Sequence, residues 1–237
     1  MIRCSVCLAE NDDFAVTCKK CKAFLQNRVP NLDLFETAWR ILESPRATFR
    51  QIVLAKHKNY SLFLFSLFGI SLSFTAFWYF KLGSRFDTLL DLVPGAVVVG
   101  IGLGAASAIV LTLAYHLIAK LLGGVASVRD SLALLAYSLT PIAVSLFIVL
   151  PIELLTFGMY LFTSNPHPYT IKPVSYVILV GFDVIVSLWS LGLAILATKV
   201  GHRISTAKSL AVTVAALALF GAVILFAAGK LHLIDQA

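Results

Sequence analysis

The chain has 237 residues, of which 59% are hydrophobic and only 13% are charged. A soluble domain is typically about 45–50% apolar and about 25% charged, so this composition excludes an ordinary soluble fold and indicates a protein embedded in a lipid bilayer. The net charge of +7 does not indicate nucleic-acid binding, because that function usually needs a basic patch on a soluble surface. We therefore expect the bilayer as a partner and no nucleic acid.

The four cysteines lie close to the N-terminus, with the spacing Cys4-x2-Cys7-x10-Cys18-x2-Cys21. Paired Cys-x-x-Cys turns are typical of tetrahedral zinc sites. A four-thiolate site is closed to substrate, and about 25 residues are too few for a core without such a crosslink. The sequence predicts a zinc-ribbon-like head over residues 1–28 with structural zinc on these cysteines; two disulfides or four free thiols are the alternatives.

Residues 29–58 are predicted to form two short amphipathic helices beside the membrane. Apolar residues recur at helical spacing between Leu34 and Leu42. Ser44 and Pro45 then suit an N-cap and a first helical position. We expect an interfacial anchor; the alternative is a docking surface for a soluble partner or anionic lipid head groups. The residues expected to make these contacts are Trp39, Arg46, Phe49 and Arg50.

Residues 59–237 are predicted to be an all-α membrane domain, a five-helix transmembrane bundle. A helix needs about 20 apolar residues to cross a hydrocarbon core of about 30 Å. Five segments meet this length, namely Tyr60–Phe80, Val93–Leu122, Ser131–Phe162, Val174–Thr198 and Ser209–Gly229. The third segment is either one tilted helix or a span followed by an interfacial piece at Pro151. No cleavable signal peptide is expected, and the first span would act as the insertion signal.

The positions of Lys and Arg predict the orientation of the bundle, because these residues favour the cytoplasmic side. A cytoplasmic N-terminus places all of them inside except Lys81, Arg85, Lys172 and Lys230. Large domains count little in this comparison, so Lys56 and Lys58, directly before the first span, are the strongest local signal. We expect the N-terminus in the cytoplasm and the C-terminus outside, in the bacterial inner (plasma) membrane.

Two of the predicted spans contain rows of small residues. Gly100-x-x-x-Gly104 in the second span allows close helix contact, and the fifth span has a similar row in Ala211, Ala215, Ala218, Gly221 and Ala222. Packing within the bundle is the first interpretation of both rows, and homodimerisation is the alternative.

Glu153 and Asp183 lie on consecutive antiparallel spans at similar predicted depth, roughly 13–16 Å below the outer surface. Carboxylates in lipid are costly and tend to face an interior or a cavity. The two groups could form a structural pair that shares a proton, or line a path for a substrate or protons. In a third interpretation, Pro151 breaks the helix and leaves Glu153 at an interface.

Motifs of catalysis are missing from the sequence. We find no phosphate-cradling Gly-rich loop, no His-Glu-x-x-His pair and no Gly-x-Ser-x-Gly turn. The five histidines are scattered and suggest no metal cluster. We therefore expect a protein that is not an enzyme.

Four stretches are informative in their order, namely AWRILESPRATF (38–49), LGGVASVRDS (122–131), AYSLTP (136–141) and STAKS (205–209). They resemble the membrane domain of the bacterial branch of the Yip (Ypt-interacting protein) family, over roughly residues 34–228. The four-cysteine head lies outside this region and is similar to zinc-ribbon heads that precede many membrane domains. The resemblance implies a five-span bundle with a cytosolic N-terminus and no catalytic residues.

Two functions remain in competition. The first is a non-enzymatic scaffold or adaptor that contacts a protein partner through the cytosolic head and the amphipathic segment. The alternative is a transporter or lipid-handling protein that uses Glu153 and Asp183; an intramembrane enzyme is a weaker third. A lipid-sized cavity lined by the two carboxylates would favour the alternative, and a tightly packed bundle with an exposed apolar face on the head would favour the adaptor.

Overall fold

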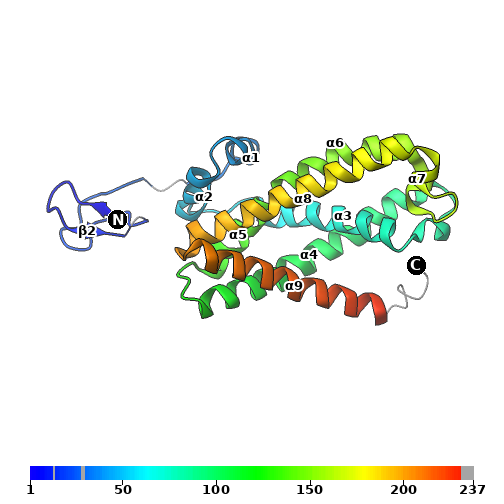
Figure 1. Ribbon diagram of the computed structural model, residues 1–237. Coiled ribbons are helices and arrows are strands. Elements are labelled where there is room, and N and C mark those ends of the chain that lie inside the picture. Colours follow the sequence, from blue (N-terminus) through cyan, green and yellow to red (C-terminus); the bar gives the residue numbers. More distant parts are fainter. Residues whose placement is uncertain (13, 28–29, 231–237) are drawn as a thin grey trace. The chain divides into compact units, whose positions relative to one another are not determined.

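The computed structural model describes residues 1–12, 14–27 and 30–230 and divides into two compact units, Met1–Asn59 and the part from Tyr60 onward (Figure 1). Each unit is described separately below. The predicted junction between the head and the amphipathic segment, at residues 28–29, lies outside the described residues, as does the C-terminal end of the predicted membrane domain, 231–237.

The N-terminal unit begins with the short strands β1 (Ile2–Arg3) and β2 (Glu10–Asn11), which pair antiparallel with Ile2 opposite Asn11. A second, isolated bridge joins Thr17 to Phe24. Each antiparallel pairing frames one Cys-x-x-Cys turn. Strands this short cannot hold a fold by themselves, so the turns and what they bind must define the head.

Two helices follow in the same unit, α1 (Leu34–Glu43) and α2 (Pro45–Leu54). The Asp33 side chain caps α1 by accepting from the backbone N–H of Glu36 at 2.8 Å. Pro45 occupies the predicted first turn of α2, but the Ser44 side chain does not cap it. The Ser44 hydroxyl instead donates to the Arg40 carbonyl of α1 at 3.4 Å, because the two helices follow one another without a linker.

The predicted bundle of five spans is confirmed within the part of the chain that the structure describes. Helices long and apolar enough to cross a membrane cover Ser61–Tyr79 (α3), Leu89–Leu121 (α4), Val128–Phe162, Pro173–His202 (α8) and Thr206–Lys230 (α9). Short 3-10 and α-helical turns connect them at the end of the bundle where α3 finishes, namely η1 (Leu82–Arg85), η2 (Gly158–Phe162) and α7 (Pro168–Ile171). We call this end the Tyr79 end and the opposite one the Ser61 end.

The third span is broken at Leu139, into α5 (Val128–Ser138) and α6 (Thr140–Phe157). The prediction of an interfacial piece at Pro151 is wrong, because Pro151 lies inside α6. The break falls just before Pro141, which has no N–H to give to the carbonyl of Tyr137. The Thr140 hydroxyl donates to this carbonyl at 2.7 Å instead, so the break leaves no orphaned backbone group there.

Glycines join α3 to α4 within the bundle. Gly69 of α3 faces Gly100 and Gly104 of α4, and a Cβ at Gly104 would overlap the Phe65 carbonyl oxygen and lie 2.7 Å from the Ser66 Cα. The first interpretation of the Gly100-x-x-x-Gly104 pair, packing within the bundle, is therefore confirmed for these two residues.

The alanine row of α9 behaves differently. The expectation that Ala211, Ala215, Ala218 and Ala222 pack within the bundle is wrong, since all four are exposed. Ser209 and Thr213 of α9 are buried against the bundle instead, and Thr213 bonds to Thr198 of α8 at 3.2 Å. Lipid offers hydroxyls no partner but accepts alanine, which explains the orientation. Homodimerisation stays a prediction.

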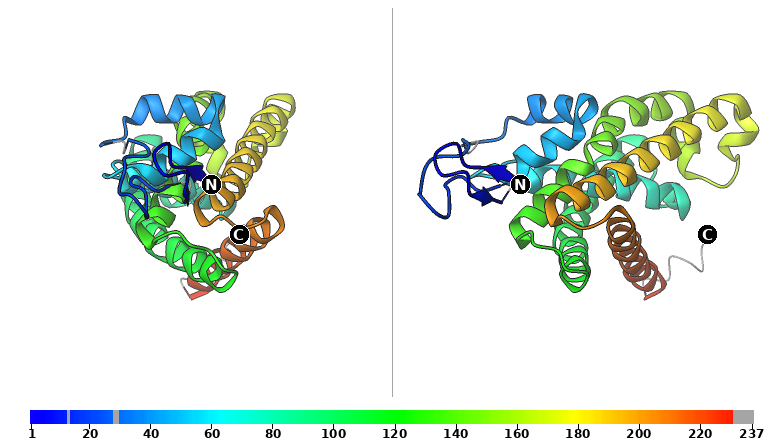
Figure 2. Two further views of the ribbon diagram at one scale, coloured as in Figure 1. Left: turned by 90° about the vertical axis from the view of Figure 1, so that its left-hand side faces the viewer. Right: turned by 60° about the vertical axis from the view of Figure 1, so that its left-hand side comes forward.

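Helix α5 occupies the interior at the Ser61 end, where it contacts α3, α4 and α8. Toward the Tyr79 end α6 takes its place and runs beside α8 (Figures 1 and 2). A cluster of buried aromatic and aliphatic side chains, including Phe74, Phe77 and Phe162, fills the core at the Tyr79 end.

Candidate functional site

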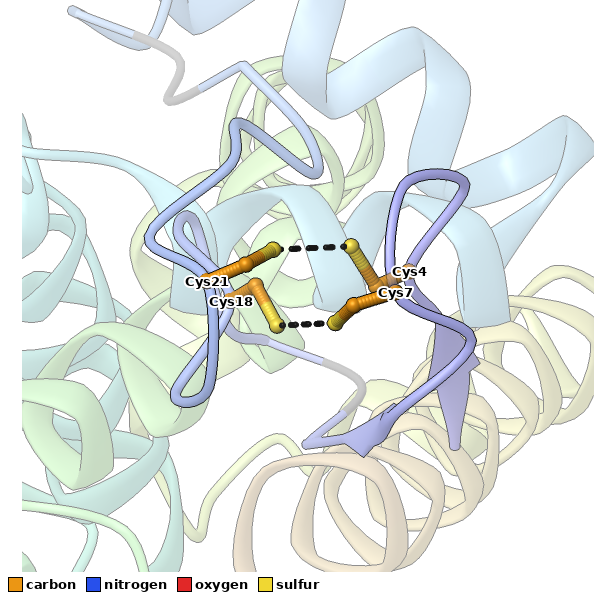
Figure 3. Close-up of side chains that lie close together, drawn as sticks. All are labelled: Cys4, Cys7, Cys18 and Cys21. Carbon is orange, nitrogen blue, oxygen red and sulfur yellow. Dashed lines mark hydrogen bonds between the residues drawn. The ribbon is translucent and has the colours of Figure 1, made fainter.

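The four cysteine side chains converge on one point in the N-terminal unit (Figure 3). Their sulfur atoms all lie within 4.8 Å of one another, and the Cys4–Cys21 and Cys7–Cys18 pairs are each 3.5 Å apart. The cysteines are free, not disulfide-bonded. Tetrahedral Zn–S bonds of about 2.3 Å place sulfur atoms about 3.8 Å apart, so the cluster fits a metal ion of this kind.

The two Cys-x-x-Cys turns have the same backbone design. In the first, Leu8 donates its N–H to the Cys4 carbonyl at 3.0 Å; in the second, Lys22 does the same to Cys18. Both donors adopt a left-handed conformation, with φ of 55° at Leu8 and 61° at Lys22. The turn directs N–H groups at the sulfur atoms, since Val6 and Lys20 each donate to the first cysteine of their turn at 3.4 Å.

These N–H groups favour thiolates at the first cysteine of each turn. Backbone donation from Cys7 and Val6 lowers the pKa of the Cys4 thiol, and donation from Cys21 lowers the pKa of Cys18 to about 6. The N–H of Ala23 acts in the same sense on Cys21, but the thiols of Cys7 and Cys4 together with burial raise its pKa to about 12. Four crowded sulfurs thus resist full ionisation unless a cation joins them, which is what a metal provides.

Asn11 joins the two turns and was not singled out from the sequence. Its side chain is 3% exposed. The Nδ2 atom donates to the Ala9 carbonyl at 2.8 Å and to the Cys18 sulfur at 3.5 Å, while Oδ1 accepts from Lys19 N–H at 2.9 Å. Its only sequence signal is an amide side chain between two Cys pairs, which is too common to predict such a role.

The predicted contact residues of the amphipathic segment differ in accessibility. Trp39 is 64% exposed and donates from Nε1 to Glu43 at 2.6 Å. Arg46 is exposed, and Arg50 lies over the Phe14 ring at 5.8 Å from its centroid. Phe49 is completely buried, because it faces inward on α2, and it offers no surface for lipid or a partner.

Glu153 of α6 and Asp183 of α8 are brought together inside the membrane domain. Both carboxyl groups line the same cavity, and the Ser145 hydroxyl donates to Asp183 at 3.3 Å. Two carboxylates that share a site of low dielectric constant disfavour each other's ionisation. Glu153 is 9% exposed and lies within the continuous helix α6, so the interpretation that Pro151 leaves it at an interface is wrong.

The carboxyl pair lines a cavity of about 610 Å³ between α3, α6, η2 and α8. Asp183 lies ten residues after the start of α8 at Pro173, roughly 15 Å from the Tyr79 end at about 1.5 Å per residue. The wall is mainly aliphatic and aromatic, with hydroxyl groups of Ser71, Thr75 and Ser187 between.

A buried polar network at the Ser61 end was also missed by the sequence. The Ser131 hydroxyl lies 2.9 Å from Nδ1 of His116 and 3.1 Å from Nε2 of His202. His202 is completely buried, and Gly124 leaves the space for its ring, because a Cβ there would overlap Nδ1. The network joins α4, α5 and α8, and the loop between α4 and α5 is tied to it because the Val125 N–H donates to the His202 carbonyl at 3.3 Å. The scattered positions of the histidines in the sequence did not predict it.

These observations define a multi-pass membrane protein with a four-cysteine head and an acidic intramembrane cavity. A family model described as Yip1 domain matches residues 39–228, and the chain belongs to this family. The match begins within α1 and excludes the cysteine cluster, as the sequence resemblance predicted. Searches of the curated proteins and of the solved structures found no match.

Proposed function

We propose that this Yip-family protein is a non-enzymatic membrane protein that binds a lipid-like molecule in the cavity beside Glu153 and Asp183. The cavity volume of about 610 Å³ carries the proposal, because sites for small molecules typically measure about 300–1,000 Å³. An apolar wall with a few polar groups suits an amphiphile. Of the two functions that the sequence left open, the cavity favours lipid handling or transport.

Photolabelling tests this function on the full chain in nanodiscs. The probe is a phosphatidylethanolamine with a diazirine on one acyl chain, and labelled residues are mapped by mass spectrometry. We expect labelling of the cavity wall that drops several-fold in Ser71→Phe, because the added ring fills the space. Labelling near the exposed Phe226 of α9 serves as the internal control and should not change. Equal labelling of the cavity wall in both proteins would contradict the proposal.

For the head, we propose that the four cysteines bind one zinc ion with a structural role. Four thiolates leave no open coordination position for a substrate. We place the head in the cytoplasm of a bacterial cell and the bundle in its inner membrane, with the C-terminus outside. Two observations support this placement: the four cysteines are not disulfide-bonded, as is usual in a reducing compartment, and Lys56 and Lys58 precede the first span.

A second candidate function, a scaffold or adaptor, is favoured by exposed apolar side chains in the N-terminal unit. Phe35 is 84% exposed and stands one helical turn from Trp39 on α1. In the head, Val6, Leu8 and Phe24 are exposed as well. Exposed apolar groups near each other are common at protein interaction sites.

Crosslinking pull-downs test the adaptor function. A double Phe35→Ser, Trp39→Ser variant and a truncation of residues 1–28 are each compared with the full chain. We expect specific crosslinked partners of the full chain to be lost from one or both variants, because the exposed rings supply the contact area. The matched control is Tyr169→Ser, which removes an exposed ring from the connection between the third and fourth spans. An unchanged set of partners in both variants would exclude the adaptor function.

A further inference from the structure

We propose that the molecule bound beside Glu153 and Asp183 is a hydrophobic organic cation, such as an amphiphile with an ammonium group, and that it enters in exchange for a proton. This inference rests on the proposed function of the cavity and names the class of its ligand. The carboxyl pair alone would not support this inference. It is supported by the volume of the cavity, the side chains that line it and its acidic charge taken together.

The charge of the cavity wall is acidic. Among the described residues that line it, Glu153 and Asp183 carry the ionisable groups, and Lys, Arg and His are missing from that set. Lys81 is not one of the lining residues, but its Nζ lies 5.3 Å from the centroid of the Trp78 ring, which lines the cavity. An ammonium group would therefore meet two carboxyl groups in this wall, whereas a phosphate would meet no basic side chain among the lining residues.

The remaining wall suits the body of an organic cation. Rings of Phe68, Phe74 and Phe162 line the cavity together with aliphatic side chains. Aromatic faces attract ammonium groups, most strongly when the site is desolvated. A small metal ion would use the carboxylates but leave most of the volume and all of the rings without a role.

The proton on the carboxyl pair keeps the charge of the cavity constant during the exchange. Glu153 and Asp183 line one largely apolar cavity, where two ionised carboxylates repel each other and a proton is kept on the pair. When an ammonium group enters, the O–H bond of the protonated carboxyl breaks, its electron pair stays on the oxygen and the proton leaves to water. One positive charge replaces another, so the cavity avoids two uncompensated carboxylates in a medium of low dielectric constant.

Isothermal titration of the full chain in maltoside micelles tests the inference with two matched probes. One is benzyltrimethylammonium, and the other is neopentylbenzene, its neutral isostere with carbon in place of nitrogen. We expect the cation to bind the wild type at least tenfold more tightly than Glu153→Gln, Asp183→Asn. Its affinity should rise by up to about tenfold per pH unit while the proton is released, and the measured heat should depend on the ionisation enthalpy of the buffer.

Three variants make the outcomes distinct. Asp87→Asn removes an exposed carboxylate outside the cavity and should leave cation binding unchanged. Ser71→Phe keeps both carboxyls and should abolish binding of both probes, which locates binding in the cavity. If the double variant does not fold, the comparison of the two probes and the proton release of the wild type test the charge preference. Cation binding without proton release, or equal affinity for both probes, overturns the inference and leaves the proposed function standing. Binding of neither probe to the wild type overturns both.

Discussion

Replacing Cys4 or Cys18 by serine is expected to lower the zinc affinity of the head by more than about 100-fold and to unfold residues 1–27. Mutation of residues that only support the ligands of a metal site lowers the metal affinity about 10- to 100-fold. The loss of a ligand itself should lower it further. The head has two-residue strands and few other buried side chains, so metal binding supplies its folding free energy, about 10–16 kcal/mol in zinc-finger peptides. Zinc content by elemental analysis and protease protection of the head measure the effect on the full chain.

The matched control for this prediction is Ser5→Ala. Ser5 is exposed between the two cysteines of the first turn, and its replacement should leave one zinc ion per chain and full protease protection. Cobalt substitution adds a second readout, because tetrahedral thiolate coordination gives a characteristic visible spectrum. A head of Cys4→Ser that keeps its zinc and its protection would contradict the assignment of these cysteines as structural ligands.

Replacing Gly104 by alanine is expected to destabilise the membrane domain by about 1–3 kcal/mol. The added methyl group would overlap the Phe65 carbonyl oxygen and press on the Ser66 Cα. Both neighbours are backbone atoms of α3, so no side chain can rotate away and the two helices must separate. Thermal unfolding of the full chain in detergent, followed by tryptophan fluorescence, measures the change.

Gly102→Ala is the matched control, on the same helix and two residues away. A Cβ at Gly102 has no neighbouring atom within 4 Å, and the residue is exposed. Alanine is favoured over glycine in helices by up to about 1 kcal/mol, so this variant should be as stable as the wild type or more so. Opposite signs for the two variants separate helix packing from helix propensity; stabilisation by both would show that the α3–α4 contact is not close.

The spans and the cysteine cluster could be predicted from the sequence because both depend on local properties. Hydropathy over about 20 residues identifies a span, and the observed ends of α3 lie within one residue of the predicted ones. Two Cys-x-x-Cys turns need only a short loop to meet, so their spacing predicted the cluster. The length and composition of the chain likewise excluded an ordinary soluble fold.

Contacts between helices could be predicted only in part. The sequence placed Glu153 and Asp183 at a similar depth, but depth does not determine which face of a helix meets its neighbour. The same limitation explains the exposed alanines of α9 and the position of Asn11. In each case the contact is made with a residue of another element. A row of small residues has the same sequence pattern whether it faces protein or lipid.

The sequence by itself thus determined that the chain is a multi-pass membrane protein with a four-cysteine head. The tertiary structure decided that α6 and α8 bring two carboxyl groups to the wall of one cavity of about 610 Å³, which α3 lines from the other side. A cavity depends on the side chains of several helices at once. No single stretch of sequence carries that information, whereas each span and each cysteine turn is encoded within its own short segment.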